Sequence, residues 1–346
     1  MSTLDVPVVL FMFKRRDTTL KVLREIAAAS PSMLYLIGDG PRDAEEAQRV
    51  RECREAVDAF VDTMDCDVVR NYADSNRGVF ENIAGGARWV FEREDRAIFL
   101  EDDTIPDPTF FPFCEDMLTR YEKDDRVLWV CGTNYLGQSK AEDGSDYVFT
   151  QHMLPCGWAS WASKFPRYYD GELDLFTSAN VESIRSQYSS ARLYAYDVGR
   201  VGGERQRRDQ GQQFLSWDYQ MAFSIRVYEK LGIAPTSNLI LNVGDDPDST
   251  HGGTSRFNTM TRRFCGIPTR PLAFPLNHPS EIAVDRRFEA RTTKIVLPPQ
   301  SRLRRWGVLA FKRVFAVPAD VSTREALHQL RGRVVSLGGA RRPRNG

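Results

Sequence analysis

The sequence predicts an α/β fold in which helices flank a doubly wound, mixed, mostly parallel sheet. Short apolar runs, typical of strands buried on both faces, recur along residues 1–135, and each is followed by an amphipathic helical stretch. Strands and helices that alternate at this spacing favour a parallel sheet. The third observation is an acidic triplet, Glu101-Asp102-Asp103, directly after the apolar run Ala97–Leu100. Ligands of open α/β sheets bind beyond the carboxyl ends of the strands, so the triplet marks the expected site.

The elements of the first half follow from where the apolar residues fall. Continuous apolar or β-branched runs predict strands at 6–13, 33–37, 68–69, 97–103 and 127–131. Apolar residues at helical spacing predict four helices between these strands: one ending at Ser30-Pro31, one over 47–60, one opening at Asn76-Arg77-Gly78, and one over 110–121. Pro106 and Pro108 are expected to end the fourth strand.

The pattern changes after residue 135. Strands are expected at 147–149 and 238–243, and a helix at 217–230 that Gly232 closes as its C-cap. Residues 155–161 (PCGWASW) are expected to form an aromatic turn that leads into a short helix. The glycine-rich segments 199–213 and 244–253 are expected to be mobile loops. Residues 1–135 and 136–300 are thus expected to be two halves of one domain, followed by a separate tail at 301–346.

Charge is unevenly distributed along the chain. Formal net charge is zero, but residues 301–346 hold eleven Arg and Lys against two acids, a net of +9 that leaves the first 300 residues at −9. An acidic body does not suggest nucleic acid as a partner. The N-terminus lacks a basic region ahead of its short apolar run, so we expect a cytoplasmic protein. Apolar and cationic residues alternate in the tail, which fits either an amphipathic helix lying peripherally on an anionic membrane or a helix packed on the body.

Three adjacent acids after a buried strand repel one another and resist leaving water. A divalent cation would offset their charge, and carboxylate oxygens suit Mg²⁺ or Mn²⁺ better than zinc. The alternative is a solvated acidic turn. Local chemistry leaves both interpretations open, so other segments must decide between them.

Several segments together resemble nucleotide-sugar glycosyltransferases of the GT-A fold, a Rossmann-like architecture. FLEDDTIPDPTFFPF is similar to the metal motif of the N-acetylglucosaminyltransferase that begins hybrid and complex N-glycan branching, where the Asp-x-Asp motif has the form Glu-Asp-Asp. VPVVLFMFKRR, LIGDGPR, RVLWVCGTNYLG, PCGWASW, SWDYQ and STHGG follow in the family's order. The resemblance covers roughly residues 6–255 and is closer to bacterial cell-surface polysaccharide transferases than to the eukaryotic enzyme.

This resemblance implies roles for the residues at the strand ends. Asp103 would contact Mn²⁺ or Mg²⁺ directly, while Glu101 and Asp102 would hold the ribose, the sugar or metal-bound water. Arg15 would meet the diphosphate or the base of the donor, and Asp39 would accept the imide hydrogen of uracil. The donor-binding set is completed by Asn76 and Arg77, which the resemblance places against nucleotide or phosphate. Ordinary strand-end and helix-capping chemistry is the alternative for the residues outside the triplet.

An inverting transfer needs a base that removes the proton of the acceptor hydroxyl as this hydroxyl attacks the anomeric carbon. The resemblance assigns that role to Asp218 in SWDYQ, with Asp170 and Glu172 in reserve. An Asp at a helix start is also a common capping device, which is the alternative. The sequence departs from the eukaryotic pattern here, because SWDYQ has one Asp where that enzyme has a pair.

Aromatic and basic residues of the second half complete the expected site. Three tryptophans are expected to line the acceptor or sugar pocket, with core packing as the alternative: Trp158, Trp161 and Trp217. His251 lies in the loop 244–253 and would contact diphosphate or metal when this loop closes over the donor. Arg205, Arg207 and Arg208 would meet a charged, lipid-linked acceptor or be solvated.

The sequence therefore predicts a metal-dependent, inverting glycosyltransferase that moves a sugar from a UDP-sugar, UDP-N-acetylglucosamine being the suggested donor, to a surface glycan or lipid-linked acceptor. One alternative is a non-catalytic scaffold of the same fold that binds a glycan. The other is a sugar nucleotidyltransferase, which usually needs a glycine-rich loop with a lysine after the first strand. No glycine lies between Leu4 and Ile37, and this counts against it.

Overall fold

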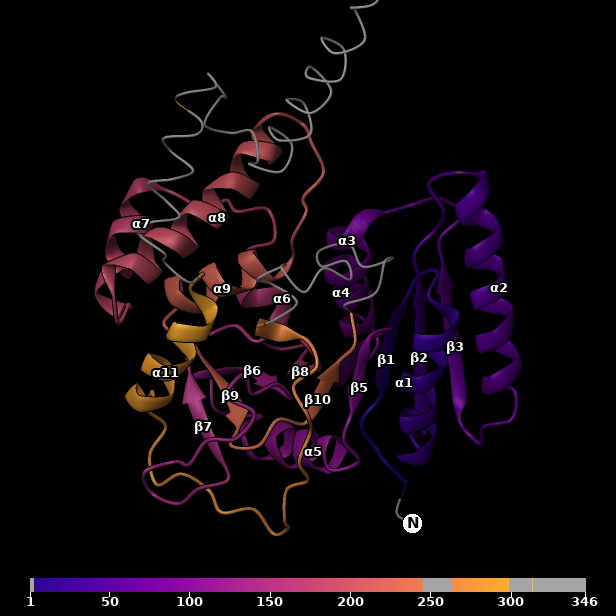
Figure 1. The fold of residues 1–346 in the computed structure, drawn as a ribbon, viewed down its shortest axis with the longest axis horizontal. Helices are drawn as coiled ribbons and strands as arrows, with labels where there is room; N and C mark the ends of the chain where they lie inside the picture. The colour runs from indigo at the N-terminus through magenta and orange to yellow at the C-terminus, as the bar shows by residue number, and fades with distance from the viewer. Residues whose placement is uncertain (1–2, 245–262, 299–312, 314–346) are drawn as a thin grey trace, which may run out of the picture. The chain divides into compact units, whose positions relative to one another are not determined.

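The structure is a computed structural model that describes residues 3–244, 263–298 and 313. The chain divides into two compact units, Met1–Leu297 and Pro298–Gly346. The strands and helices given below all belong to the first unit (Figure 1). The expectations for His251, for the loop beyond Gly244 and for the tail 301–346 concern residues outside the described ones, apart from Arg313.

Eight strands of the described chain form one mixed sheet in the order β3-β2-β1-β4-β8-β6-β9-β7. The strands of this sheet are β1 Val8–Met12, β2 Met33–Gly38, β3 Asp67–Tyr72, β4 Arg96–Glu101, β6 Val127–Cys131, β7 Tyr147–Thr150, β8 Trp158–Trp161 and β9 Leu231–Pro235. The four strands β3, β2, β1 and β4 are parallel, as are β6 and β9, whereas β8 and β7 run antiparallel to their neighbours. A small antiparallel sheet pairs β5 (Thr104–Pro106) with β10 (Ile240–Asn242).

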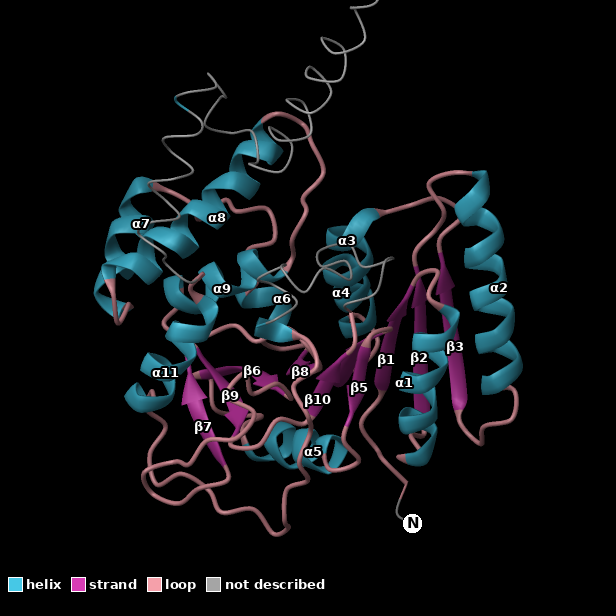
Figure 2. Ribbon diagram, viewed as in Figure 1, coloured by secondary structure: helices cyan, strands magenta, loops and turns pink. Residues whose placement is uncertain are grey.

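Helices cover both faces of the large sheet (Figure 2). They are α1 Arg16–Ala28, α2 Ala44–Val61, α3 Gly78–Phe80, the π-helical turn η1 Glu81–Gly85, α4 Gly86–Phe91, α5 Phe110–Arg120, α6 Phe165–Tyr168, α7 Ser178–Ser183, the 3₁₀ turn η2 Ile184–Gln187, α8 Ala191–Asp209, α9 Asp218–Val227 and α11 Arg286–Val296. The expected α/β class, with a mixed, mostly parallel sheet between helices, is confirmed.

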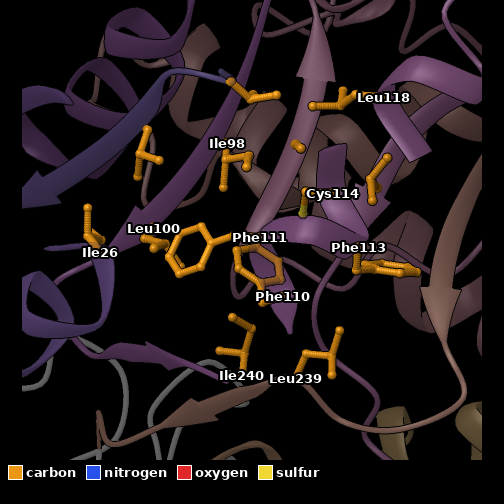
Figure 3. Close-up of a cluster of buried hydrophobic side chains, with 14 of the residues drawn as sticks. Ile26, Ile98, Leu100, Phe110, Phe111, Phe113, Cys114, Leu118, Leu239 and Ile240 are labelled. Atoms are coloured by element: carbon orange, nitrogen blue, oxygen red, sulfur yellow. The ribbon is translucent and has the colours of Figure 1, made fainter. Parts of the chain in front are cut away.

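Two hydrophobic clusters, one on each face of the sheet, form the core. Alternate residues of β1 divide between them, because side chains of a strand point to opposite faces. Val8 and Leu10 join residues of α1, α2 and α5 in the first cluster, part of which is shown in Figure 3. Val9 and Phe11 join residues of α3, α4, α6 and α9 in the second. Both faces of β1 are thus covered, which explains its continuous apolar sequence.

The elements expected in the first half are confirmed. The strand expected at 68–69 is longer and extends over β3, and the strand expected at 97–103 ends at Glu101, before the short β5. The helix expected to open at Asn76-Arg77-Gly78 begins at Gly78 and contains the π-helical turn η1.

Three expectations for the second half are wrong. Residues 158–161 form the central strand β8 instead of a turn into a helix, because they pair with β4 on one side and β6 on the other. Most of 199–213 lies in helix α8, which Ser190 caps by accepting from the Leu193 amide. Gly232 lies inside β9, and α9 ends at Val227 with Tyr228 as its C-cap.

None of the described helices combines the length and the apolar character that crossing a membrane requires.

Candidate functional site

Three neighbouring strands place polar residues at one edge of the sheet. The acidic triplet begins at the last residue of β4, Arg15 follows β1 by three residues, and Asp39 follows β2 directly. β1 lies between the other two, with Phe11 opposite Glu101 and Met12 opposite Gly38. The sheet order also reverses here, since the chain passes from β1 outward to β3 and then returns to β4. This edge is the topological switch point at which open α/β sheets bind ligands.

Arg15 bridges two acids of the triplet. Its guanidinium donates to a carboxylate oxygen of Asp102 and, at 2.9 Å, to Oδ2 of Asp103. The other oxygen of Asp102 accepts from the Phe13 amide at 3.3 Å. Burial raises the pKa of Asp102 to about 6 although Arg15 opposes the shift. Because both of its oxygens have partners and it is 6% exposed, Asp102 serves to position Arg15.

Glu101 lies among three other acids and Arg15. Burial raises its pKa well above the ordinary value, the charges of Asp103, Asp102 and Asp218 raise it further, and Arg15 opposes the shift. The Thr104 hydroxyl accepts from the Glu101 amide at 2.8 Å and donates to the Glu101 carbonyl at 2.9 Å, so it fixes the turn that holds the triplet. Three neighbouring acids thus disfavour the charged form of Glu101, and Arg15 opposes them only in part.

Asp39 holds a neighbouring loop in place. Its Oδ1 accepts from the amides of Gly40, at 2.8 Å, and Arg77, at 2.7 Å, while Oδ2 accepts from the Asn76 side chain at 2.9 Å. Burial raises the pKa of Asp39, and these amide hydrogen bonds oppose the shift. The Arg77 guanidinium donates to the side chain of Asn71 at 2.8 Å. Asp39, Asn76 and Arg77 therefore form one hydrogen-bonded unit beside the triplet.

Asp218 is the first residue of α9, but it does not cap that helix. The Tyr219 amide donates to the Ser216 hydroxyl at 3.0 Å, and this hydroxyl donates to Oδ1 of Asp218 at 2.7 Å. The first-turn amide that a capping Asp would accept from is therefore bonded to Ser216 instead. The Asp218 carboxylate is oriented by one hydroxyl and acts electrostatically on Glu101, which links α9 to the triplet.

The three tryptophans expected to line a pocket lie in the core instead. Trp158 is 1% exposed and stacks between Phe99, with ring centroids 3.9 Å apart, and Trp129, at 4.2 Å. Trp161 is equally buried and its indole N–H donates to the Leu118 carbonyl at 2.9 Å. Trp217 is 4% exposed. Their strand and helix-start positions turn these rings into the sheet's hydrophobic layer, so core packing was the correct alternative.

The reserve acids have structural partners. Asp170 accepts from the amides of Asp174, at 3.0 Å, and Leu175, at 2.7 Å, so it closes a turn. Glu172 lies 3.6 Å from Arg208.

The basic residues expected in a loop lie on α8 and are engaged within the chain. Arg205 donates to Asp209 at 2.9 Å, Arg207 to the Gln213 carbonyl at 2.8 Å, and Arg208 to Asp174 at 2.8 Å.

Sequence reasoning missed two residues that support the triplet. Asn242 of β10 donates to Cys156 Sγ at 3.2 Å and accepts from the Gly244 amide at 2.8 Å. A Cβ on Gly244 would lie 2.3 Å from Asp103 Oδ2, so any side chain there would require Asp103 or the backbone to shift. No sequence signal marked Asn242, while a glycine in a polar segment was a signal for Gly244 that we read only as flexibility.

The described residues contain no group of three or more His, Cys, Asp or Glu side chains arranged to hold a metal ion. The donors present nevertheless fit a hard cation that shares its coordination with a ligand. Mg²⁺ in particular is usually bound by one or two carboxylates together with substrate phosphates and water. Asp103 and Glu101 are the two partly exposed carboxylates of the triplet, and the repulsion by neighbouring acids that raises the pKa of Glu101 is the feature that a divalent cation would offset.

The sequence matches no protein-family model and no curated protein. Among solved structures, the chain is similar to a mannosyltransferase from Pyrobaculum calidifontis in complex with GDP-Man and Mn²⁺, with a TM-score of 0.38, 12% identity, and coverage of 64% of this chain and 69% of that one. It is similar to the glycosyltransferase GlyE of Streptococcus pneumoniae, with a TM-score of 0.31, 11% identity, and 72% and 57% coverage. A UDP-glucose pyrophosphorylase complexed with UDP-glucose gives a TM-score of 0.32, 9% identity, and 68% and 92% coverage. All three TM-scores lie below 0.5.

Proposed function

We propose that this chain is a metal-dependent, inverting glycosyltransferase. It moves a sugar from a UDP-sugar, with UDP-N-acetylglucosamine as the first donor to test, to a hydroxyl of a cell-surface glycan or a lipid-linked acceptor. The observation that carries the proposal is the surplus of carboxylates at the switch point of the sheet. Asp103 and Asp218 both raise the pKa of Glu101 there, and Arg15, which pairs with Asp103, opposes the shift.

Glu101 and Asp103 would hold the divalent cation of such an enzyme. When bound, this cation supplies Lewis-acid stabilisation to the diphosphate leaving group. Arg15 lies against Asp103 and would contribute a second positive charge at the same place. Asp102 would fix the guanidinium of Arg15, since it is buried and its oxygens are already engaged.

Asp218 would be the general base. In an inverting transfer the acceptor oxygen forms a bond to the anomeric carbon while the bond from that carbon to the diphosphate breaks, and the hydroxyl proton moves to the base. The Ser216 hydroxyl orients the Asp218 carboxylate. Among the described residues no helix amide donates to this carboxylate, because the Tyr219 amide bonds to Ser216 instead, so the carboxylate can receive a proton.

The proposal is tested by calorimetric titration of the full chain with UDP, GDP and CMP, each with and without Mn²⁺. We expect UDP to bind only with the metal, and we expect Asp103→Ala to lose this binding while keeping its folded circular dichroism spectrum. Asp65→Ala is the matched control, because Asp65 is an exposed acid remote from the triplet in sequence. If no nucleotide binds with any metal, the triplet is a solvated acidic turn and the scaffold alternative takes precedence.

A further inference from the structure

One arginine beside the proposed base differs from the other arginines of its helix. Arg200 lies on α8 with its guanidinium carbon 3.5 Å from the ring centroid of Tyr219, and the ring of Tyr196 lies on the same guanidinium at 5.2 Å. Tyr219 directly follows Asp218 at the start of α9. Stacking therefore fixes the guanidinium on the residue that directly follows the proposed base in the chain.

The hydrogen-bonding groups of Arg200 are not used within the described chain. Arg205, Arg207 and Arg208 all donate to carboxylates or carbonyls, whereas Arg200 makes no hydrogen bond or salt bridge with any described residue. A guanidinium carries five N–H donors in a planar fork that matches a carboxylate or a phosphate. A half-buried guanidinium with these donors unused is a ready anion-binding group.

The side chain of Tyr135 is affected by the charges of both Arg200 and Asp218. Burial raises its pKa well above the ordinary value; the charges of Cys156 and Asp218 raise it further, and Arg200 lowers it. Tyr135 therefore interacts electrostatically with Asp218 and Arg200 at once, and its ring packs on Phe264 with centroids 4.6 Å apart. Its hydroxyl has no hydrogen-bond partner in the described part of the chain, so it offers a further polar contact beside Asp218.

The two helices that carry these residues pack together. Figure 1 shows α8 and α9 lying close together, and their residues contact one another. Gly199, which precedes Arg200, is exposed, and a Cβ there would meet no atom within 4 Å. The stacked guanidinium and Asp218 thus belong to one pair of contacting helices, whereas Arg15 follows β1.

We infer that Arg200 binds an anionic group of the acceptor, a phosphate or a carboxylate, while Asp218 receives the proton of the acceptor hydroxyl. This inference rests on the proposed function and specifies its acceptor as an anionic molecule. It also separates two charges: Arg15 belongs to the donor side of the site, and Arg200 to the acceptor side. A neutral glycan would leave the donors of Arg200 unused and gain nothing from it.

The test uses the full chain saturated with UDP and Mg²⁺, so that the donor side is filled. Inorganic phosphate, glucuronate and neutral glucose are titrated separately at constant ionic strength, with binding followed by calorimetry. We expect phosphate or glucuronate to bind and glucose not to bind, and the preferred anion tells a phosphorylated acceptor from an acidic sugar. Arg200→Gln should weaken anion binding about tenfold, because a charge-assisted hydrogen bond at a half-buried site is lost.

The control variant is Arg207→Gln, which removes the same charge from the same helix and should leave anion affinity unchanged. Arg200→Lys keeps the charge without the planar fork and should give an intermediate affinity. UDP affinity should be the same in all variants, which shows that the donor side is intact. If UDP binds but neither anion does, or if anion affinity is unchanged in Arg200→Gln, this inference is overturned alone. If UDP does not bind the wild-type protein, the proposed function is overturned as well.

Discussion

The hydroxyl of Ser216 donates a 2.7 Å hydrogen bond to the carboxylate of Asp218. The same hydroxyl accepts from the Tyr219 amide, so it satisfies a first-turn amide of α9 and orients the acid at once. This arrangement separates two roles that one Asp at a helix start often combines. Ser216 supports the helix, whereas Asp218 is free to exchange a proton with a ligand.

The first prediction follows from this division of roles. Asp218→Asn should lower the rate of sugar transfer about 10²- to 10⁴-fold, which is the usual contribution of a general base. UDP affinity and the free energy of unfolding should change little, because the amide keeps the shape of the side chain. Initial rates with saturating donor, together with calorimetry of UDP binding, measure both effects. Transfer at the wild-type rate would remove Asp218 from the mechanism.

Ser216→Ala removes the hydroxyl that bonds to the Tyr219 amide and keeps the Asp218 carboxylate. Losing the cap should lower the free energy of unfolding by about 1 kcal/mol, measured by urea denaturation. The transfer rate should fall less than in Asp218→Asn, because the carboxylate loses its orientation but remains present. A stability loss in Asp218→Asn as large as that in Ser216→Ala would mean that Asp218 supports the helix after all.

The second prediction concerns the close approach of Gly244 to the triplet. An added methyl group in Gly244→Ala would lie 2.3 Å from Asp103 Oδ2, so one of the two must move. Displacing a group of the site by about 1 Å can cost on the order of 10²-fold in activity. We expect metal-dependent UDP affinity to fall at least tenfold, measured by calorimetry with Mn²⁺. Unchanged affinity would show that Asp103 does not need its present position.

Residue patterns predicted the parallel half of the sheet and the acidic edge because these features are local. All five residues of β1 are buried, so the strand appears in the sequence as one apolar run. The carboxyl ends of parallel neighbours share one edge, so Arg15, Asp39 and the triplet could be expected near one another before any contact was known.

Features that depend on distant partners were missed. Ala159 of β8 lies opposite both Ile98 and Val130, but Pro155 and Gly157 just before the strand are local turn signals. The same limit applies to Arg200, whose role depends on stacking against another helix. Local composition indicates where turns fall and which face of a helix or strand is buried. Whether a segment becomes a central strand, and which helix packs on which, depends on tertiary contacts.

The third prediction concerns the glycines of α8, whose number led to the wrong expectation of a loop. A Cβ on Gly203 would meet no atom within 4 Å, and the residue lies inside the helix. Gly203→Ala should therefore raise the free energy of unfolding by about 0.5–1 kcal/mol, because alanine loses less backbone entropy in a helix. Gly144→Ala is the control: its surroundings are equally open, but its φ of +78° is unfavourable for alanine, so stability should fall. Denaturant titration of both variants tests the helix directly.

The last prediction is a pH dependence of stability at Glu46. This buried carboxylate accepts from the Arg42 side chain at 2.9 Å, from the Arg42 amide at 3.1 Å and from Lys14 at 2.7 Å. The Arg42 hydrogen bonds, aided by Lys14 and opposed by burial, hold the pKa of Glu46 well below its ordinary value of 4.5. The folded protein therefore binds fewer protons here than the unfolded chain, so this stabilisation is present above pH 4.5 and is lost as the pH falls.

Glu46→Gln should consequently be less stable than wild type by about 2 kcal/mol at pH 7, and the difference should shrink as the pH is lowered below 4.5. Glu45 is an exposed neighbour in the same helical turn, and Glu45→Gln should have nearly the unfolding free energy of the wild type at every pH tested. Urea denaturation of the three proteins at several pH values between 3 and 7 measures how far the unfolding free energy of each variant differs from that of the wild type. A Glu46→Gln deficit of constant size over this range would mean that the side chain stabilises the fold through its packing, because packing does not depend on the protonation of the carboxylate.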